Sequence, residues 1–202
     1  EETLDTLASW STPEGAQEGD AYIWHVMHDV DGDGTEEGVV SLPLPGIGCG
    51  ATFCPRTVAV LERSGDRFSP GTVISSDAGM LMLGSPTLRF TEDVNVDGQT
   101  EIVLEEQSCG AHTCFTLLIV GHWDGATWYD LTADPIDQAY TDLTIEDRDG
   151  DGILEFAMTG GTFGSAGAGL QRPHTLIFDW QDGAYRRVED IPAPSDHPYY
   201  LM

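Results

Sequence analysis

Short runs of apolar residues recur along the whole chain, and each run is bounded by polar residues or glycine. The clearest runs lie at residues 21–27, 38–42, 57–61, 102–104, 116–120, 156–158 and 175–178. They are rich in β-branched and aromatic residues and lack the 3.6-residue period of an amphipathic helix, which together favour strands. The pattern therefore predicts an all-β protein.

Between the first two strands of three successive units, the sequence repeats one acidic loop. The loops span residues 29–37, 93–101 and 147–155, and we call them the first, second and third loop. Side chains with oxygen atoms occupy loop positions 1, 3, 5 and 9, and glycine occupies position 6. The oxygen-bearing residues are Asp29, Asp31, Asp33 and Glu37 in the first loop, Asp93, Asn95, Asp97 and Glu101 in the second, and Asp147, Asp149, Asp151 and Glu155 in the third.

This spacing predicts that each loop binds a hard cation, with Ca²⁺ as the expected cofactor and about three ions per chain. Calcium takes about 6–8 oxygen ligands, and glycine at position 6 allows the sharp turn that directs alternate side chains inward. Position 7 varies between Thr35, Gln99 and Ile153, as expected if only its backbone carbonyl is a ligand. The second loop has Asn95 in place of a carboxylate and is expected to bind most weakly.

The EF-hand is the main alternative for such a loop, and two features argue against it. An EF-hand needs a bidentate Glu at position 12 and helices on both sides of the loop. Position 12 is Val40, Leu104 or Met158, and the flanking runs favour strands. The pattern indicates that these loops connect strands.

A turn signal separates the last two predicted strands of each unit. Gly65-Asp66, Asp124-Gly125 and Asp182-Gly183 each follow an apolar run and precede an aromatic residue. An Asp-Gly pair between apolar runs is a strong hairpin signal. With the strand that precedes the acidic loop, every unit contains four predicted strands.

Charge narrows the possible partners. The chain of 202 residues has 35 acidic and 8 basic residues, a formal net charge of −27. Because no basic patch is present to neutralise phosphates, nucleic acid and anionic membrane surfaces are not expected partners. No apolar run approaches the roughly 20 residues that a membrane-spanning helix needs. The chain opens at Glu1 without a signal peptide, so we expect a mature chain or an excised domain.

The four cysteines form two pairs with the same spacing, Cys49 with Cys54 and Cys109 with Cys114. The repeated local spacing favours two local disulfides, each contributing ~2 kcal/mol on the chain-entropy model. Zinc binding by the four thiolates is the alternative. Because disulfides persist outside the cytosol, where free calcium is also abundant, we expect the protein to be extracellular or at the cell surface.

The acidic loop between the first two strands of a four-stranded repeat resembles the FG-GAP or VCBS-like repeat of integrin α-subunit propellers and bacterial surface proteins. The resemblance covers about residues 20–190 and implies propeller-type blades at about residues 20–79, 80–135 and 136–190, with calcium bound in each loop. Residues 1–19 are then an N-terminal extension and residues 191–202 a C-terminal tail. Closed propellers have typically about four to eight blades, so three blades predict an open or compact arrangement.

These features favour a non-catalytic calcium-binding structural or adhesion module that joins other protein chains through open sheet edges, including copies of itself. A calcium-dependent glycan- or protein-binding domain is the alternative, because Trp10, Trp24, Trp123, Trp128 and Trp180 offer aromatic surfaces. We interpret most of these tryptophans as core residues. A hydrolase is the least favoured class, since the six histidines show no zinc-protease spacing and no nucleophile motif is present.

Overall fold

The computed structural model describes residues 23–43, 56–65, 67–74, 86–109, 113–162 and 171–194. The secondary structure of these residues consists of strands, with no helix among them, which confirms the predicted all-β class. Accordingly, these residues include no helix able to span a membrane. The strands are β1 (Ile23–His28), β2 (Glu37–Pro43), β3 (Arg56–Ser64), β4 (Arg67–Ile74), β5 (Thr87–Glu92), β6 (Glu101–Cys109), β7 (Cys114–Trp123), β8 (Trp128–Asp130), β9 (Ile136–Ala139), β10 (Asp142–Glu146), β11 (Glu155–Gly160), β12 (His174–Gln181) and β13 (Ala184–Pro192).

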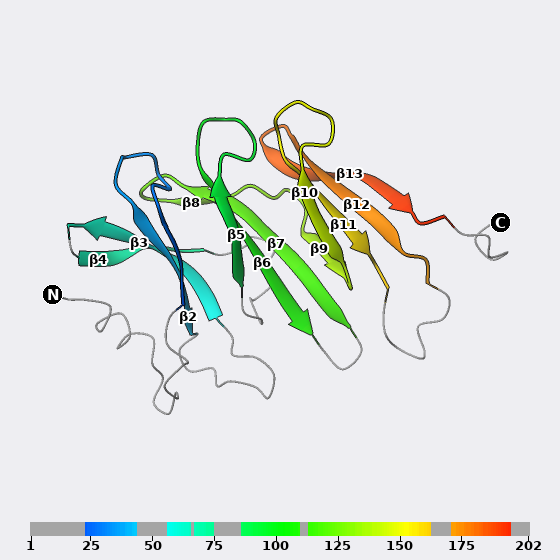
Figure 1. Cartoon of the computed structure of the whole chain (residues 1–202), viewed down its shortest axis with the longest axis horizontal. Coiled ribbons are helices and arrows are strands. Elements are labelled where there is room, and N and C mark those ends of the chain that lie inside the picture. The colour runs from blue at the N-terminus through cyan, green and yellow to red at the C-terminus, as the bar shows by residue number, and fades with distance from the viewer. Residues whose placement is uncertain are drawn as a thin grey trace.

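The strands form three antiparallel sheets, each built around a four-strand meander. The first sheet has the order β1-β2-β3-β4, the second β5-β6-β7-β8, and the third β10-β11-β12-β13. The first and third sheets lie on opposite sides of the second (Figure 1). The row does not close into a ring.

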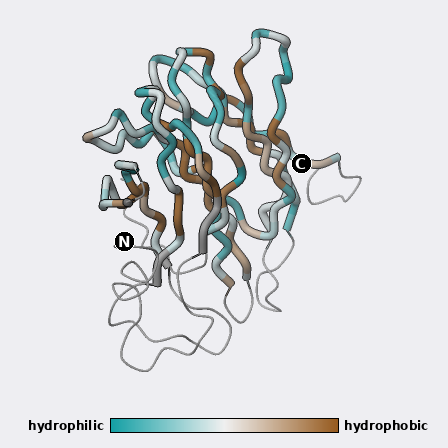
Figure 2. Tube along the Cα trace, turned by 60° about the vertical axis from the view of Figure 1, so that its left-hand side comes forward, coloured by the Kyte–Doolittle hydropathy of each residue, from teal (hydrophilic) through white to brown (hydrophobic). Residues whose placement is uncertain are grey.

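The central strands of the second sheet, β6 and β7, are buried on both faces because they are apolar at successive positions. Alternate residues of a strand point to opposite faces. Ile102 and Leu104 on β6 pack into a cluster with Val39 and Val60 of the first sheet. Val103, between them, packs into a second cluster with residues of the third sheet. The apolar positions therefore lie along the middle of the strands and the polar ones in the loops (Figure 2).

The cluster between the second and third sheets contains three buried aromatic side chains. Phe156, Phe178 and Tyr185 are at most 1% exposed. The rings of Phe156 and Tyr185 meet edge to face with centroids 4.7 Å apart, an arrangement that aromatic pairs prefer. Burial of such side chains contributes roughly 1.5–3 kcal/mol each, so this packing fixes the third sheet against the second.

Strand β9 belongs to the second sheet, whereas the expected repeat boundary places its residues, 136–139, in the third unit. The backbone of β9 instead pairs antiparallel with β7 of the second sheet, with Ile136 opposite Leu118. Ile136 is fully buried in the cluster between the two sheets, and this burial holds β9 against β7.

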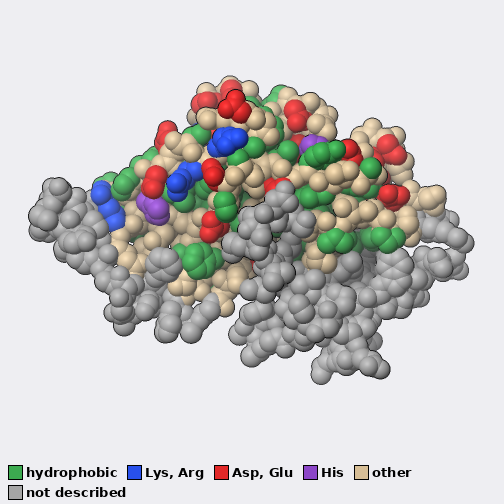
Figure 3. Space-filling view, turned by 180° about the vertical axis from the view of Figure 1, so that it is seen from behind, with side chains coloured by type: hydrophobic (Ala, Val, Ile, Leu, Met, Phe, Trp, Pro, Cys, Tyr) green, Lys and Arg blue, Asp and Glu red, His purple; other side chains and the backbone are tan. Residues whose placement is uncertain are grey.

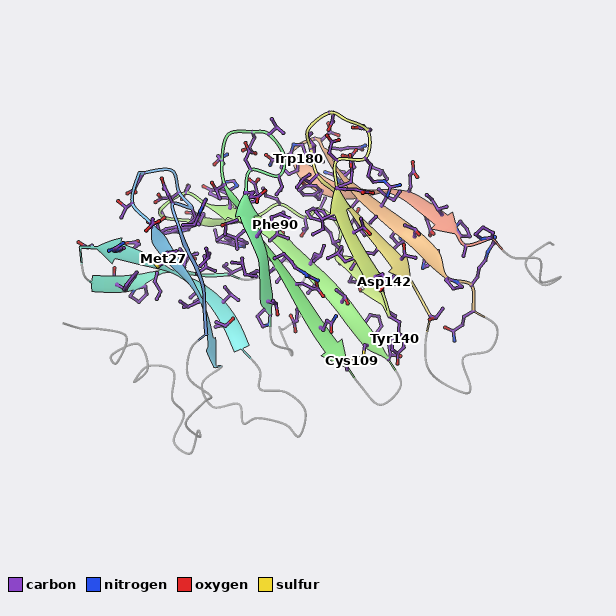
Figure 4. All side chains as sticks on the ribbon, viewed as in Figure 1. Met27, Phe90, Cys109, Tyr140, Asp142 and Trp180 are labelled. Atoms are coloured by element: carbon purple, nitrogen blue, oxygen red, sulfur yellow. A yellow bond between two sulfur atoms is a disulfide. The ribbon has the colours of Figure 1, made fainter. Side chains whose placement is uncertain are left out.

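One of the two expected disulfides lies within the described residues. Cys109 and Cys114 are disulfide-bonded and face each other across the ends of β6 and β7. Cys109 lies at the opposite end of the sheet from the acidic loop (Figure 4). Cys49 and Cys54 lie outside the described residues. The disulfide therefore closes one end of the second sheet and leaves the other end to the loop.

Candidate cation-binding loops

The three acidic loops lie along one edge of the molecule. They connect β1 to β2, β5 to β6 and β10 to β11, and all three rise from the same side of the row of sheets (Figure 1). Viewed from behind, carboxylate side chains follow this edge and few basic side chains accompany them (Figure 3). The sequence expectation that the loops join the first two strands of each unit is confirmed.

Each loop closes through the same set of internal hydrogen bonds. The amide of the glycine at position 6 donates to the carboxylate at position 1, at 3.0 Å in all three loops. The side chain at position 3 accepts from the amide at position 5, and the side chain at position 5 accepts from the amide at position 7. The Glu at position 9 accepts from the amide at position 2. The alternate acidic positions therefore build the same turn three times.

The turn requires positive φ at positions 4 and 6. The glycines at position 6 have φ of 90°, 88° and 93° in the first, second and third loops. At position 4 the first and third loops again have glycine, but the second loop has Val96, with φ of 59° and 60% of its surface exposed. A β-branched residue in this region is strained, because its Cβ approaches the following carbonyl oxygen.

We expect Val96→Gly to raise the free energy of unfolding by about 1 kcal/mol, because glycine removes the left-handed strain. Urea unfolding of the metal-free protein measures the change. The matched control is Val73→Gly, since Val73 is 57% exposed on β4 and is not among the residues with positive φ. The control should lower stability by about 0.5–1 kcal/mol. A loss of stability in both variants would contradict the assignment of strain to Val96.

The loops differ in how closely their carboxylates gather. All four acids of the third loop, Asp147, Asp149, Asp151 and Glu155, offer oxygen atoms within 4.8 Å of one another. In the first loop Asp29, Asp31 and Glu37 form such a group, without Asp33. The acids of the second loop, which the structure describes in full, form no such group.

A side-chain amide distinguishes the second loop. Asn95 donates from Nδ2 to Asp97 Oδ2 at 3.2 Å. The neutral side-chain amide is therefore bonded to a carboxylate oxygen that could otherwise be a ligand of a cation. Asn95 is itself only 4% exposed. The substitution noted in the sequence therefore changes the contacts of the loop as well as its charge.

The glutamates at position 9 are the buried members of the loops. Glu37, Glu101 and Glu155 are 3%, 0% and 4% exposed. Burial is the main cause that raises the pKa of all three, and neighbouring loop aspartates raise it further. For Glu101 the pKa rises to about 7. These carboxylates therefore bind a proton more readily than ordinary glutamates do.

Two carboxylate oxygens in these loops are buried without a hydrogen-bond partner, Asp29 Oδ1 and Glu101 Oε1. Burying a polar atom without a partner is costly, and more so for a charged group. The unpartnered oxygens, the exclusively oxygen donor set and the closed loop geometry all fit a hard cation. Each loop could hold one through its side chains at positions 1, 3, 5 and 9 and the carbonyl at position 7.

Residues outside the ligand pattern also shape the loop edge. The hydroxyl of Tyr185 donates to the carbonyl of Val94 at 3.1 Å, and both residues are fully buried. Asp31 Oδ2 lies 2.7 Å from the position that a Cβ atom on Gly125 would occupy, so the β7–β8 turn packs on the first loop. The sequence marked Gly125 as a hairpin residue, but no local signal revealed these contacts of Gly125 and Tyr185.

The tryptophans of the second and third sheets pack in the core, as the sequence analysis favoured. Trp123 is 2% exposed between the first two sheets. Trp128 packs partly buried on the same cluster, and Trp180 on the cluster beneath the second and third loops (Figure 4). Trp10 and the side chain of Trp24 lie outside the described residues. Trp123 therefore has no open surface for stacking on sugars, whereas Trp128 and Trp180 keep part of theirs.

No protein-family model, curated protein or solved structure matches this chain significantly. The resemblance to FG-GAP and VCBS-like repeats therefore rests on the loop pattern and its place between strands. The evidence for a function is therefore the geometry of the three loops.

Proposed function

We propose that this chain is a non-catalytic extracellular module in which about three Ca²⁺ ions, one per loop, rigidify three propeller-type blades. The observation that carries the proposal is Glu101, a fully buried carboxylate with one oxygen unpartnered and with the pKa raised to about 7. Its position in the loop is equivalent to those of Glu37 and Glu155. A bound cation would supply the partner that this oxygen lacks.

Calcium suits this donor set better than the other common cations. The loops offer carboxylate, amide and carbonyl oxygens, whereas zinc and copper favour imidazole or thiolate. Magnesium demands near-ideal octahedral geometry and gives up its water reluctantly, but calcium accepts about 6–8 oxygens in flexible arrangements. Extracellular calcium modules bind at about 10⁻⁴–10⁻³ M, which matches the proposed location.

The partners proposed are other protein chains, including further copies of this one. The first and third sheets end the row (Figure 1), and among the described strands the outermost strand of each sheet pairs with a neighbour on one side only. Such edges invite pairing with another chain. Rigid loops on one edge would hold the three sheets in a fixed arrangement for docking.

Light scattering on size-exclusion fractions, with metal analysis of the same fractions, tests the proposal. We expect about three calcium ions per chain in millimolar calcium, none after a chelator, and a loss of compactness or assembly when calcium is removed. Circular dichroism follows the fold. Absence of bound calcium at millimolar concentration would overturn the metal assignment, and a monomer under both conditions would overturn self-assembly.

The second loop should bind calcium most weakly, because Asn95 replaces a carboxylate and holds Asp97 through its amide. Asn95→Asp should tighten binding at this loop about tenfold, equivalent to about 1.4 kcal/mol. The backbone amide signals of Gly34, Gly98 and Gly152 in a calcium titration by NMR resolve the loops, since each amide bonds to position 1 of its own loop. Equal affinities in the unmodified protein would contradict the prediction.

A further inference from the structure

The peptide groups of Val94 connect the second loop to the third. The amide of Val94 donates to Glu101 Oε2 at 2.9 Å, and its carbonyl accepts from the amide of Leu154 at 2.9 Å and from the hydroxyl of Tyr185 at 3.1 Å. Val94 is fully buried. Because buried backbone groups need partners, a displacement of any of these three donors or acceptors would be costly.

Leu154 occupies position 8 of the third loop. It lies between Ile153, whose carbonyl is the expected ligand at position 7, and Glu155, the buried acid at position 9. A cation held by both neighbours would fix the peptide between them. The amide of Leu154 would then be fixed in the direction of the Val94 carbonyl.

A side chain of the second loop also lies near the third loop. Val96 Cγ2, in the second loop, lies 3.6 Å from the position that a Cβ atom on Gly152 would occupy in the third loop. The two loops also lie side by side along the edge (Figure 1). The left-handed backbone of Val96 therefore places a largely exposed apolar side chain beside the neighbouring loop.

The first loop lacks such a connection. Residues 29–37 and 93–101 are all described, and no hydrogen bond joins one of these loops to the other. The first loop instead packs on the β7–β8 turn, where Asp31 approaches Gly125. It therefore provides a matched internal control with the same acidic pattern.

We infer that the second and third loops bind cations as a coupled pair, connected through Val94, while the first loop binds independently of the second. The inference rests on the proposed calcium binding. Occupancy of the third loop fixes Leu154, which holds the Val94 peptide and with it the Glu101 carboxylate. By reciprocity, occupancy of the second loop raises the affinity of the third by the same factor, and couplings between sites are typically about 5–150-fold.

Calcium titrations by NMR, with the amides of Gly34, Gly98 and Gly152 as reporters, test the coupling. One variant disables the third loop by Asp149→Asn with Asp151→Asn, and its control disables the first by Asp31→Asn with Asp33→Asn. Both remove two negative charges. We expect the calcium midpoint of Gly98 to rise at least about fivefold in the third-loop variant and less than about twofold in the control. Equal shifts of Gly98 in the two variants would overturn the coupling.

Tyr185→Phe provides a milder test, because it removes only the hydroxyl that bonds to the Val94 carbonyl. We expect it to weaken calcium binding at Gly98 and to leave Gly34 unchanged. An unchanged Gly98 midpoint in this variant would count against the route through Val94. If none of the three glycine amides responds to calcium in the unmodified protein, the proposed function is wrong. If all three respond but the second and third loops titrate independently of each other, only the coupling is wrong.

Discussion

Saturating the loops with calcium should raise the melting temperature of this protein by about 10 °C. At a calcium concentration about ten times the dissociation constant, each site adds ~1.4 kcal/mol to the free energy of unfolding, so three sites add about 4 kcal/mol. For a domain of this size, 1 kcal/mol corresponds to roughly 2–4 °C. Differential scanning calorimetry of metal-free protein, with and without calcium, measures the shift.

The physical cause is the concentration of charge in the loops. Carboxylate oxygens lie within 4.8 Å of one another in the first and third loops, and without a cation their repulsion opposes the turn. A control with sodium chloride at equal ionic strength separates screening from binding. The paired variant Asp147→Asn with Asp149→Asn should lose part of the shift, whereas Asp142→Asn, an exposed acid on β10, should keep it.

The sequence predicted the repeating features because they depend on local geometry. The turn needs glycine at position 6 and an acid at position 1 to accept its amide, and both are visible in nine consecutive residues. Strand order within each sheet follows from the same argument, since each predicted hairpin joins neighbouring strands. Local patterns therefore specified the meanders and the positions of the loops.

The contacts between sheets were not predictable in this way. The hydrogen bond from the Tyr185 hydroxyl to the Val94 carbonyl joins residues 91 positions apart. It depends on how the second and third sheets pack. The pairing of β9 with β7 likewise depends on burial of Ile136 between these sheets. Its short sequence carries no signal that would distinguish this partner from β10.

The strain at Val96 shows a further limit of the sequence pattern. Position 4 is glycine in the other two loops, and the repeat alone suggests that Val96 departs from the turn. The backbone nevertheless adopts the same left-handed conformation there. The hydrogen bonds at positions 1, 3, 5 and 9 evidently stabilise the turn by more than this residue opposes it.

Replacing Glu101 with Gln should stabilise the metal-free protein at pH 8 and abolish calcium binding at the second loop. Glutamine keeps an oxygen that accepts from the Val94 amide, but it removes a buried charge. The pKa of Glu101 is raised from 4.5 to about 7 in the folded protein. A raised pKa contributes stability that is fully present below 4.5 and is lost as the pH rises through about 7. The difference at pH 8 is about 3 kcal/mol.

The pH dependence distinguishes this charge from the many other acids. Urea unfolding of metal-free protein should show Glu101→Gln more stable than the parent at pH 8, and the gap should close by about pH 5. Glu189→Gln, an exposed acid on β13, should show no such gap. In millimolar calcium the advantage of Glu101→Gln should shrink or reverse, because only the parent keeps the ligand. If Glu101→Gln is less stable than the parent at both pH values without metal, the buried charge of Glu101 does not destabilise the metal-free fold, and the prediction is wrong.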